Sequence, residues 1–350
     1  MRMLSLLRMA RVLKFAPPEN PYFDPAKPHH TRLGFRNNQP TRPPSGEDFA
    51  RLQREMREAR QQPQPDPDFS PVTPDLALLH GNDGRPRVTW IGHSTVLLQI
   101  AGRSILTDPI FSARASPVPL AGPKRRQPPG VRLRDLPHID LVVISHNHYD
   151  HLDARSVRAL ARQRGGPPRF AVPLGLERWF ARHVRRLGRD FVTSLDWWDS
   201  AEIAGLTVTL APVHHWSART PWDRNTNLWG GWSIAGAGFR FFFSGDIAYS
   251  ADAAEIGRRL GPFDLAAIAV GHYEPRWFMR GSHVNPEEAV RVHRDIRSRR
   301  SLAIHFGTFQ RLTAEALDQP IKDLAAARLA HGVPEEEFFS LRHGETRVLA

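Results

Sequence analysis

Short apolar runs separated by turn residues fill the chain from residue 87 onward, a pattern that predicts β-strands. Residues 88–91 and 95–100 flank a turn at Gly92, and residues 104–107 follow a second turn. Further strands are expected at residues 141–144, 169–172, 206–213, 239–243, 265–270 and 301–304. Helical stretches fall between them, at residues 154–163, 176–187, 286–297 and 314–330. Because strand pairs come first and helices then alternate with strands, the pattern predicts a layered α/β (α+β) fold in which helices cover sheets.

The first 75 residues differ in composition from the rest of the chain. Thirteen of the 31 prolines lie before Asp75, and stretches rich in proline resist helix and central strand alike. One helix is expected at residues 45–62, because Ser45 and Asp48 resemble a capping box. Its apolar positions share one helical face: Phe49, Leu52, Met56 and Ala59. We therefore expect an N-terminal extension over residues 1–75 and one folded domain over residues 76–350.

The charge of the chain is uneven along its length. Lys and Arg number 48 against 36 Asp and Glu, a net charge of +12, and residues 1–60 hold twelve of these cations and six of the anions. Half of the excess therefore lies in the first sixth of the chain. In residues 1–15 the cations Arg8 and Arg11 interrupt the apolar centre that a secretory signal requires, so export is not supported. An interfacial helix against an anionic membrane and a plain terminus both remain open for this segment.

The composition limits the chemistry that the chain can perform. Its 350 residues, 41% of them hydrophobic, are enough to bury a large core. The chain has no cysteine, which excludes disulfide scaffolds, thiolate metal sites and thiol nucleophiles. No apolar run approaches the ~20 residues that span a bilayer. The 17 histidines are the informative surplus, and any metal must be held by nitrogen and oxygen ligands.

Chemistry concentrates directly after the strand at residues 141–144. His146 and His148 are two positions apart, so in an extended backbone both imidazoles point to the same side. Asp150 and His151 follow where the chain turns, which completes an H-x-H-x-D-H motif. This motif favours a metal site, and the alternative is a polar surface turn with clustered histidines.

A complete metal site needs further ligands, and these are expected at other strand ends, because a rigid scaffold positions loop ligands best. Three residues stand directly after apolar strands: His215, Asp246 and His305. Each alone would more often be a surface or hydrogen-bonded core residue. Their shared position at successive strand ends makes them candidate ligands.

These motifs resemble the metallo-β-lactamase fold, an αββα sandwich with a dinuclear zinc site at one edge. Several segments are more specifically similar to the phospholipases D that hydrolyse N-acylphosphatidylethanolamine. They are Trp90-Ile-Gly-His-Ser-Thr95, Leu106-Thr-Asp-Pro-Ile-Phe111, Gly122-Pro-Lys-Arg125, Gly271-His-Tyr-Glu-Pro-Arg-Trp-Phe-Met279 and His305-Phe-Gly-Thr-Phe309. The resemblance runs from about residue 88 to the C-terminus, so the N-terminal extension lies outside it.

The resemblance implies two Zn²⁺ ions per chain and a role for each candidate ligand. The first ion would be bound by His146, His148 and His215. The second would be bound by Asp150, His151 and His305, and Asp246 would bridge the two. Two such ions can generate a hydroxide between them and polarise a phosphoryl oxygen, so Asp150 and Asp246 count as catalytic residues.

Five further residues are candidates for roles around this site. The resemblance implies that His283 acts near the phosphate, as proton donor to the leaving group, with ordinary loop polarity as the alternative. Asp108 either fixes the tautomer of a ligand histidine or is a turn residue before Pro109. His214 is expected either to support a ligand or to be structural, and His272 stands where the related lipases have a small residue. His93 is expected to be a turn residue rather than a ligand.

The leading hypothesis is a zinc phosphodiesterase of phospholipase D type, in which a metal-bridging hydroxide hydrolyses N-acylphosphatidylethanolamine or a related glycerophospholipid. One alternative is a hydrolase of the same fold acting on another phosphodiester, including nucleic acid. Against nucleic acid, aromatic residues flank the ligand segments and no basic stripe does. The other alternative is a binding or regulatory protein with a retained zinc site. The expected location is the cytoplasm, peripheral on the inner membrane face at an anionic lipid surface, and a homodimer remains open.

Overall fold

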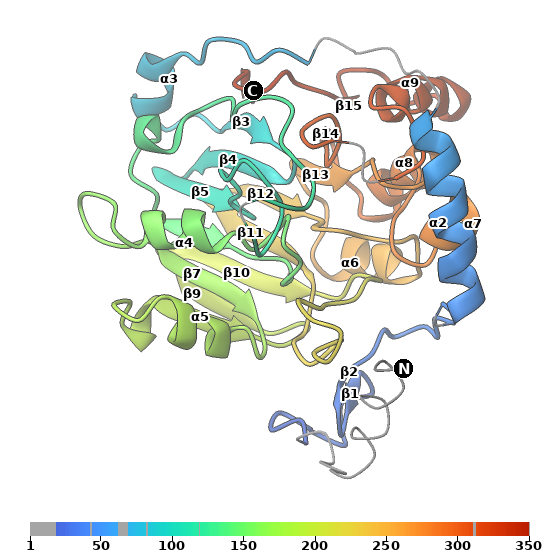
Figure 1. Ribbon diagram of the computed structural model, residues 1–350. Helices are drawn as coiled ribbons and strands as arrows, with labels where there is room; N and C mark the ends of the chain where they lie inside the picture. Colours follow the sequence, from blue (N-terminus) through green and yellow to red (C-terminus); the bar gives the residue numbers. More distant parts are fainter. Residues whose placement is uncertain are drawn as a thin grey trace.

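Two β-sheets packed face to face form the centre of the molecule, with helices on their outer faces (Figure 1). The computed structural model describes residues 19–42, 44–61, 69–81, 83–118, 120–310 and 313–349. Each sheet has seven strands, and a separate two-stranded ribbon, β1 (His30–Thr31) and β2 (Gly34–Phe35), lies in the N-terminal segment. This arrangement confirms the predicted αββα sandwich. The segment 1–15, for which an interfacial helix remained open, lies outside the described residues.

The first sheet is built mainly from the first half of the domain, in the order β16-β3-β4-β5-β6-β7-β8. Strands β3 to β5 are antiparallel hairpins, and β5 to β8 run parallel. The last strand of the chain, β16, pairs antiparallel with β3 and closes the edge. The bounds are β3 (Arg87–Gly92), β4 (Thr95–Ile100), β5 (Arg103–Thr107), β6 (Leu141–Val143), β7 (Arg169–Pro173), β8 (Val192–Leu195) and β16 (Thr346–Val348).

The second sheet repeats this plan, in the order β15-β14-β13-β12-β11-β10-β9. Strands β9 to β12 are antiparallel and β12 to β15 are parallel. The carboxyl ends of the parallel strands therefore gather at one edge in each sheet. The bounds are β9 (Ser200–Ile203), β10 (Leu206–Ala211), β11 (Gly231–Gly236), β12 (Phe239–Phe243), β13 (Leu265–Ala269), β14 (Ser301–Ile304) and β15 (Phe338–Phe339).

Helices cover the outer faces of both sheets. Helices α4 (Ala154–Leu160) and α5 (Glu177–His183) pack on the first sheet. On the second sheet lie α6 (Asp252–Arg259), α8 (Pro286–Asp295) and α9 (Gln319–His331). The remaining helices are α2 (Gly46–Gln61), α3 (Leu76–His80), α7 (Arg276–Met279) and the 3₁₀ turns η1 (Leu133–Asp135) and η2 (Arg189–Phe191). Among the described residues, no helix is both long and apolar enough to cross a bilayer.

Side-chain alternation along the strands explains the layers. In β4, Val96, Leu98 and Ile100 join the core between the two sheets, whereas Leu97 points to the opposite face and joins the core beneath α4 and α5. All six β4 residues are buried. Burying one such large apolar side chain contributes roughly 1.5–3 kcal/mol, so the doubly covered strands fix the sandwich that positions the strand ends.

Element boundaries deviate from the sequence prediction where proline or glycine intervenes. The strand expected at 206–213 ends at Ala211, directly before Pro212. The helix expected at 314–330 begins only at Gln319, because Pro320 occupies its first turn. Strands β8, β9 and β11 and helix α6 were not predicted: β8 and β9 are short and partly polar, and β11 begins and ends at glycine.

The predicted helix of the N-terminal segment is present as α2. Its capping box is confirmed, since the Ser45 hydroxyl accepts a bond of 3.1 Å from the Asp48 amide and the Asp48 carboxylate accepts one of 2.7 Å from the Ser45 amide. Figure 1 shows α2 running beside α7, where Glu55 accepts a hydrogen bond of 2.8 Å from the Trp277 indole. Met56 is buried, and the Phe49 ring meets the Phe278 ring at 5.5 Å. The predicted boundary at residue 75 stays a prediction, and these contacts join the two sides of it.

A buried carboxylate ties the start of the N-terminal segment to the domain. Asp196 is 2.6 Å from the Lys27 amine, 2.7 Å from the His29 ring and 2.8 Å from the His30 ring. The His29 ring also stacks on Trp197 at 4.5 Å. Burial opposes ionisation of Asp196, but the hydrogen bonds from His29 and Lys27 outweigh it and hold the pKa of this carboxyl well below its usual value. We call these four residues, Lys27, His29, His30 and Asp196, the arm knot.

Replacing Asp196 should release the arm knot. Asp196→Asn leaves Lys27 without its anion and the two rings without a charged acceptor, and we expect the free energy of unfolding to fall by about 3 kcal/mol. Urea denaturation at pH 7 measures this change. Asp190→Asn, at an exposed aspartate nearby, is the matched control. Equal stability of the two variants would show that the knot contributes nothing.

Candidate metal centre

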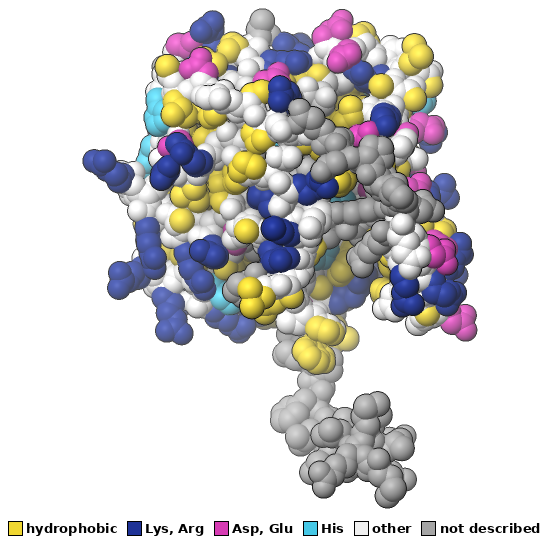
Figure 2. Space-filling view, turned by 45° about the horizontal axis from the view of Figure 1, so that its top comes forward, with side chains coloured by type: hydrophobic (Ala, Val, Ile, Leu, Met, Phe, Trp, Pro, Cys, Tyr) yellow, Lys and Arg dark blue, Asp and Glu magenta, His cyan; other side chains and the backbone are white. Residues whose placement is uncertain are grey.

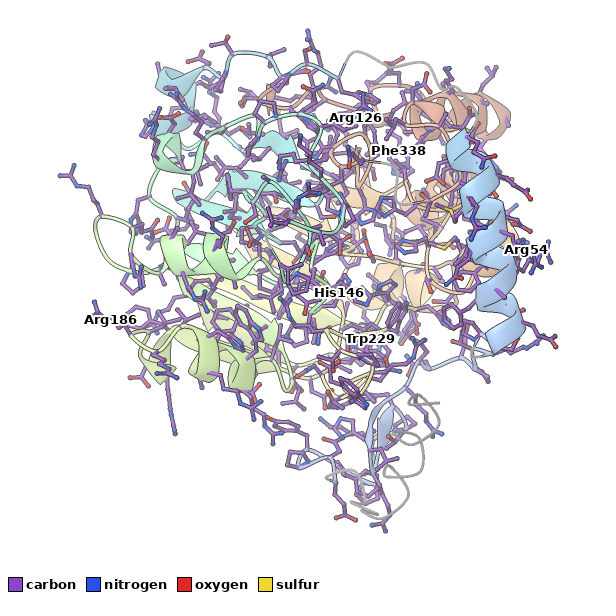
Figure 3. The ribbon with its side chains drawn as sticks, in the orientation of Figure 1. Arg54, Arg126, His146, Arg186, Trp229 and Phe338 are labelled. Carbon is purple, nitrogen blue, oxygen red and sulfur yellow. The ribbon has the colours of Figure 1, made fainter. Side chains whose placement is uncertain are left out.

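The H-x-H-x-D-H motif lies in the loop that connects β6 to α4. His146 is deep in the centre of the molecule, whereas Arg54 and Arg186 project from its periphery (Figure 3). The Arg219 guanidinium holds this loop in shape by donating bonds of 2.8 and 2.9 Å to the carbonyls of Asn147 and Leu152. The Arg219 side chain is thus engaged with the loop backbone.

A first group of four side chains converges beyond the ends of β6, β10 and β12. It contains His146, His148, His215 and Asp246, and one ligand atom from each lies within 4.8 Å of all the others. His146 Nε2 and His148 Nδ1 are 2.8 Å apart, and His215 Nε2 is 3.4 Å from the same His148 nitrogen. These are the residues that the sequence assigned to a first ion, with the bridging aspartate.

A second group lies directly beside the first. Asp150, His151, His305 and His93 have ligand atoms within 4.8 Å of one another. The Asp246 oxygens reach into this group too, at 3.2 Å from His151 Nε2 and 3.0 Å from His305 Nε2. They are 3.6 and 3.7 Å from the ring nitrogens of His215 and His146. All seven predicted ligand residues therefore meet, and Asp246 stands between the two groups.

Close approach of the chain makes this convergence possible. Gly245 has a φ of 57°, and a Cβ there would lie 2.5 Å from the Ser145 Cβ, so only glycine lets the β12 end approach the β6 end. His93, Asp108 and His305 also have positive φ values of 54°, 32° and 69°. Non-glycine residues in this region cost on the order of 1–3 kcal/mol each and cluster at functional sites.

The charges of the site are those of a cation-binding centre. Burial lowers the pKa of His148 to about 3 and that of His215 to about 4, so both rings are neutral, the form that binds metal. Burial opposes ionisation of Asp246, but the charges of His151 and His305 prevail and hold its pKa well below its usual value. Burial likewise opposes the charge on His305, yet Asp246 and Asp150 raise its pKa to about 9. Protons on His151 and His305 thus balance the negative charge of the carboxylates. Bound divalent ions would neutralise the same charge.

Asp108 supports the site from behind. Its carboxylate lies 2.6 Å from His151 Nδ1 and accepts bonds of 2.7 and 2.5 Å from the amide and hydroxyl of Ser145. The residue is fully buried, and burial raises its pKa against the opposing effect of His151. By receiving the Nδ1 proton, Asp108 leaves His151 Nε2 facing Asp246. Of the two interpretations of Asp108, the geometry favours the one that fixes a tautomer.

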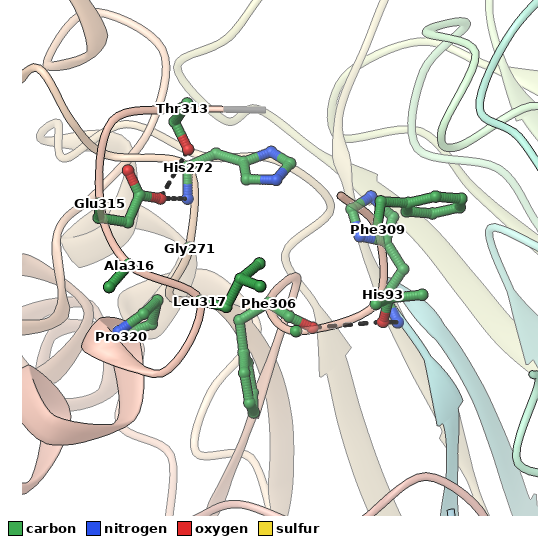
Figure 4. A pocket seen from close by; sticks show the side chains of 12 residues that line it. His93, Gly271, His272, Phe306, Phe309, Thr313, Glu315, Ala316, Leu317 and Pro320 are labelled. Atoms are coloured by element: carbon green, nitrogen blue, oxygen red, sulfur yellow. Dashed lines mark hydrogen bonds between the residues drawn. The ribbon is translucent and has the colours of Figure 1, made fainter. Parts of the chain in front are cut away.

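His283 and His272 form part of the wall of the site. The His283 ring lies 5.3 Å from the His215 ring and 5.6 Å from the His305 ring, and its buried Nδ1 has no hydrogen-bond partner among the described residues. His272 lies 4.3 Å from the His305 ring. Its amide donates to the half-buried carboxylate of Glu315, which also accepts a hydrogen bond from the Thr313 hydroxyl (Figure 4). The Arg276 guanidinium holds the His283 carbonyl at 2.7 Å.

Two histidines differ from the predicted ligands in their surroundings. His214 points away from the centre, with Nε2 2.8 Å from the Thr41 hydroxyl, which agrees with a structural role. His93 was expected to be a turn residue. It does occupy the turn between β3 and β4, but its Nε2 also lies 3.1 Å from an Asp150 oxygen. This second contact could not be predicted from the sequence, because nothing near His93 in the chain indicates that residue 150 lies beside it.

A cavity of about 730 Å³ opens beside His215. The domain contributes Trp216, Phe278 and Arg224 to its wall, and the N-terminal segment contributes residues 36–42. The Trp216 ring packs against His148 at 4.3 Å, and the Arg224 guanidinium lies 4.1 Å from the Trp216 ring. Aromatic and cationic side chains thus line a space within the volume range of small-molecule sites.

The fold and this centre define a member of the β-lactamase superfamily. A model of the β-lactamase superfamily domain matches residues 103–306, so the chain belongs to that family. It is 42% identical over 266 residues to the N-acyl-phosphatidylethanolamine-hydrolyzing phospholipase D 1 of Caenorhabditis elegans, which covers 73% of this chain and 74% of that protein. The resemblance inferred from the motifs is confirmed.

More distant similarities include a sequence relative and a solved structure. A UPF0173 metal-dependent hydrolase of Anaeromyxobacter dehalogenans is 27% identical over 257 residues, which cover 70% of this chain and 84% of that protein. A solved structure of a possible metal-dependent hydrolase from Veillonella parvula superimposes with a TM-score of 0.58 at 19% identity, covering 76% of this chain and all of that one. That structure supports the fold alone. Family and relatives together make the chain a metal-dependent hydrolase.

Asp108→Asn should weaken metal binding without unfolding the protein. The amide cannot accept the His151 proton as a carboxylate does, and loss of such partners costs about 10- to 100-fold in metal affinity. Competition with a chromogenic chelator measures the affinity. Asp153→Asn is the control, because Asp153 lies in the same loop as His151 but caps α4. If both variants retain metal as tightly as the original chain, Asp108 does not hold the ligand.

Proposed function

We propose that the chain is a zinc-dependent phosphodiesterase that hydrolyses N-acylphosphatidylethanolamine or a related glycerophospholipid by cleavage of the phospholipase D type. The observation that carries the proposal is the Asp246 carboxylate between two imidazole groups, beside a cavity lined by aromatic and cationic side chains. The name of the Caenorhabditis elegans relative supports the substrate class.

The residues of the centre fit two zinc ions. Their donors are imidazole nitrogens and carboxylate oxygens, and the chain has no thiolate to compete. His146, His148 and His215 would hold one ion, Asp150, His151 and His305 the other, and Asp246 both. When bound, such ions activate water at neutral pH and offset the charge on a phosphate.

The side chains around the centre suit a phosphodiester that carries an apolar tail. Arg36, Arg42 and Arg224 are exposed at the cavity and attract the anionic phosphate, whereas Trp216 and Phe278 offer apolar surface to an acyl chain. Hydrolysis breaks the bond between phosphorus and the headgroup oxygen. Water supplies a hydroxyl to phosphorus, which gives phosphatidate, and a proton to the departing N-acylethanolamine.

We assign the leaving-group side to His283. Burial lowers the pKa of this histidine well below its usual value, so its ring is neutral before substrate binds. A neutral ring can donate an N–H hydrogen bond to the headgroup oxygen as negative charge develops there, while the proton that the leaving group takes up comes from water. Its neighbours His215 and His305 keep it within reach of the centre.

An anionic membrane on the cytoplasmic side is the proposed location of the substrate. Leu120 and Trp222 are 91% and 87% exposed, and such apolar side chains favour a lipid surface. On the face in Figure 2, Lys and Arg are spread among hydrophobic patches rather than forming one stripe along a groove. This distribution suits a lipid interface better than nucleic acid.

Substrate preference tests the proposal directly. The metal-loaded protein should release N-acylethanolamine and phosphatidate from vesicles of N-acylphosphatidylethanolamine, and cleave phosphatidylcholine more slowly and RNA not at all. Lipid products are measured by mass spectrometry. Cleavage of RNA alone would refute the lipid assignment.

Asp246→Asn should lower this activity by more than about 100-fold. Changes to residues that only hold the ligands in place already lower metal affinity or activity by up to about 100-fold. Asp264→Asn is the control, because Asp264 lies directly before β13, pairs with Arg299 and does not reach the centre. Metal content by atomic absorption should be about two ions per chain and should fall in Asp246→Asn only. A wild-type chain that binds no metal would contradict the site assignment.

Removal of residues 1–18 should weaken membrane binding more than catalysis. This segment holds Arg2, Arg8, Arg11 and Lys14 and no acidic residue, and each cation near an anionic surface contributes about 1 kcal/mol. Co-sedimentation with phosphatidylserine vesicles should therefore drop at least tenfold, while hydrolysis of a soluble diester stays unchanged. The deletion spares the arm knot, so equal loss of both would assign these residues to the folded body.

A further inference from the structure

The backbone of His215 is held by a side chain from the N-terminal segment. The Asn37 amide group donates a bond of 2.9 Å from Nδ2 to the His215 carbonyl and accepts one of 3.1 Å at Oδ1 from the His215 amide. Among the described residues, these are the bonds made by the His215 backbone. A primary amide has a donor and an acceptor side by side. Asn37 therefore makes the pair of hydrogen bonds that a neighbouring strand would make if β10 continued beyond Ala211.

The ring of His215 has a second fixed point. Its Nδ1 lies 2.8 Å from the Ser282 carbonyl, which makes Nδ1 the protonated nitrogen and leaves Nε2 toward His148 and Asp246. Ser282 fixes the rotation of the ring, and Asn37 fixes the peptide that carries it. With the peptide free to turn, the hydrogen bond to Ser282 alone would not set the position of Nε2.

The segment around Asn37 is itself anchored on both sides. Asn38 donates a bond of 2.8 Å to Asp252 on α6, and the Thr41 hydroxyl lies 2.8 Å from His214 Nε2 and 3.2 Å from Asn37 Nδ2. Upstream, the arm knot attaches residues 27–30 to Asp196. Asn37 thus lies on a segment with little freedom, as a positioning group requires.

We infer that Asn37 is a positioning residue for His215, and that the N-terminal segment completes the metal centre. This inference rests on the metal centre of the proposed function and not on the identity of the lipid. The chain carries the ligand and its clamp 178 positions apart, in parts of the sequence that no local motif connects. The N-terminal segment therefore acts on catalysis through the geometry of one ligand as well as by lining the cavity.

Metal affinity of the full-length chain tests the inference. Zn²⁺ is titrated against a chromogenic chelator for the wild type, Asn37→Ala, Asn37→Asp and, as matched control, Asn38→Ala, which removes the neighbouring asparagine and its bond to α6. We expect Asn37→Ala to bind one of its ions about 10- to 100-fold more weakly, and Asn38→Ala to match the wild type, because Thr41 and the arm knot still hold the segment. Asn37→Asp keeps the volume and the acceptor but sets a carboxylate oxygen against the His215 carbonyl, so it should weaken binding as well.

Two further measurements separate positioning from folding and from substrate choice. Thermal unfolding of the metal-free chains should give similar midpoints for Asn37→Ala and Asn38→Ala. With a soluble diester at fixed zinc, Asn37→Ala should lower kcat more than it changes KM, because the displaced ligand affects the metal centre directly. The inference is overturned if both Asn37 variants bind two ions as tightly as Asn38→Ala. The titrations contain no lipid, so a wrong substrate assignment would leave their outcome intact.

Discussion

The ionised carboxylate of Asp246, only 3% exposed, is the constraint on which the rest of the site depends. A buried charge is costly unless opposite charges surround it, and ring nitrogens of four histidines from three segments lie within 3.7 Å of this one. Bringing those segments to one point requires parallel strands that end at the same edge in both sheets. The glycine before Asp246 and the strained residues nearby follow from the same requirement, because ordinary turns would keep the strand ends apart.

Sequence predicted the layers and much of the metal centre because both follow local rules. Strands β4, β12 and β14 have the predicted bounds, since each is a mainly apolar run bounded by turn or charged residues. The seven candidate ligands were found because they stand at strand ends. Strands β8 and β9 escaped prediction because short, partly polar strands are held by their neighbours rather than by their own pattern.

What sequence did not predict are contacts between distant positions. The arm knot joins residues about 170 positions apart, and the Asn37 clamp spans 178. The dual position of His93, in a turn and against Asp150, is of the same kind. Asparagine, histidine and lysine in a proline-rich stretch resemble ordinary surface residues, because their partners lie on the far side of the fold. From sequence, the N-terminal extension was connected only with an anionic membrane surface, and its contacts with His215 and Asp196 were not predicted.

The two sheets contribute ligands in nearly equal shares, four residues after β6 from one and His215, Asp246 and His305 from the other. Ions held between them would cross-link the halves of the sandwich, closing loops of roughly 60 to 160 residues in a chain without a disulfide. Loop-closure entropy rises only slowly with length, so links over such spans restrict the unfolded chain about as strongly as distant disulfides do. In this protein the catalytic ions would also cross-link the two sheets, and loss of metal would destabilise the whole sandwich together with the active site.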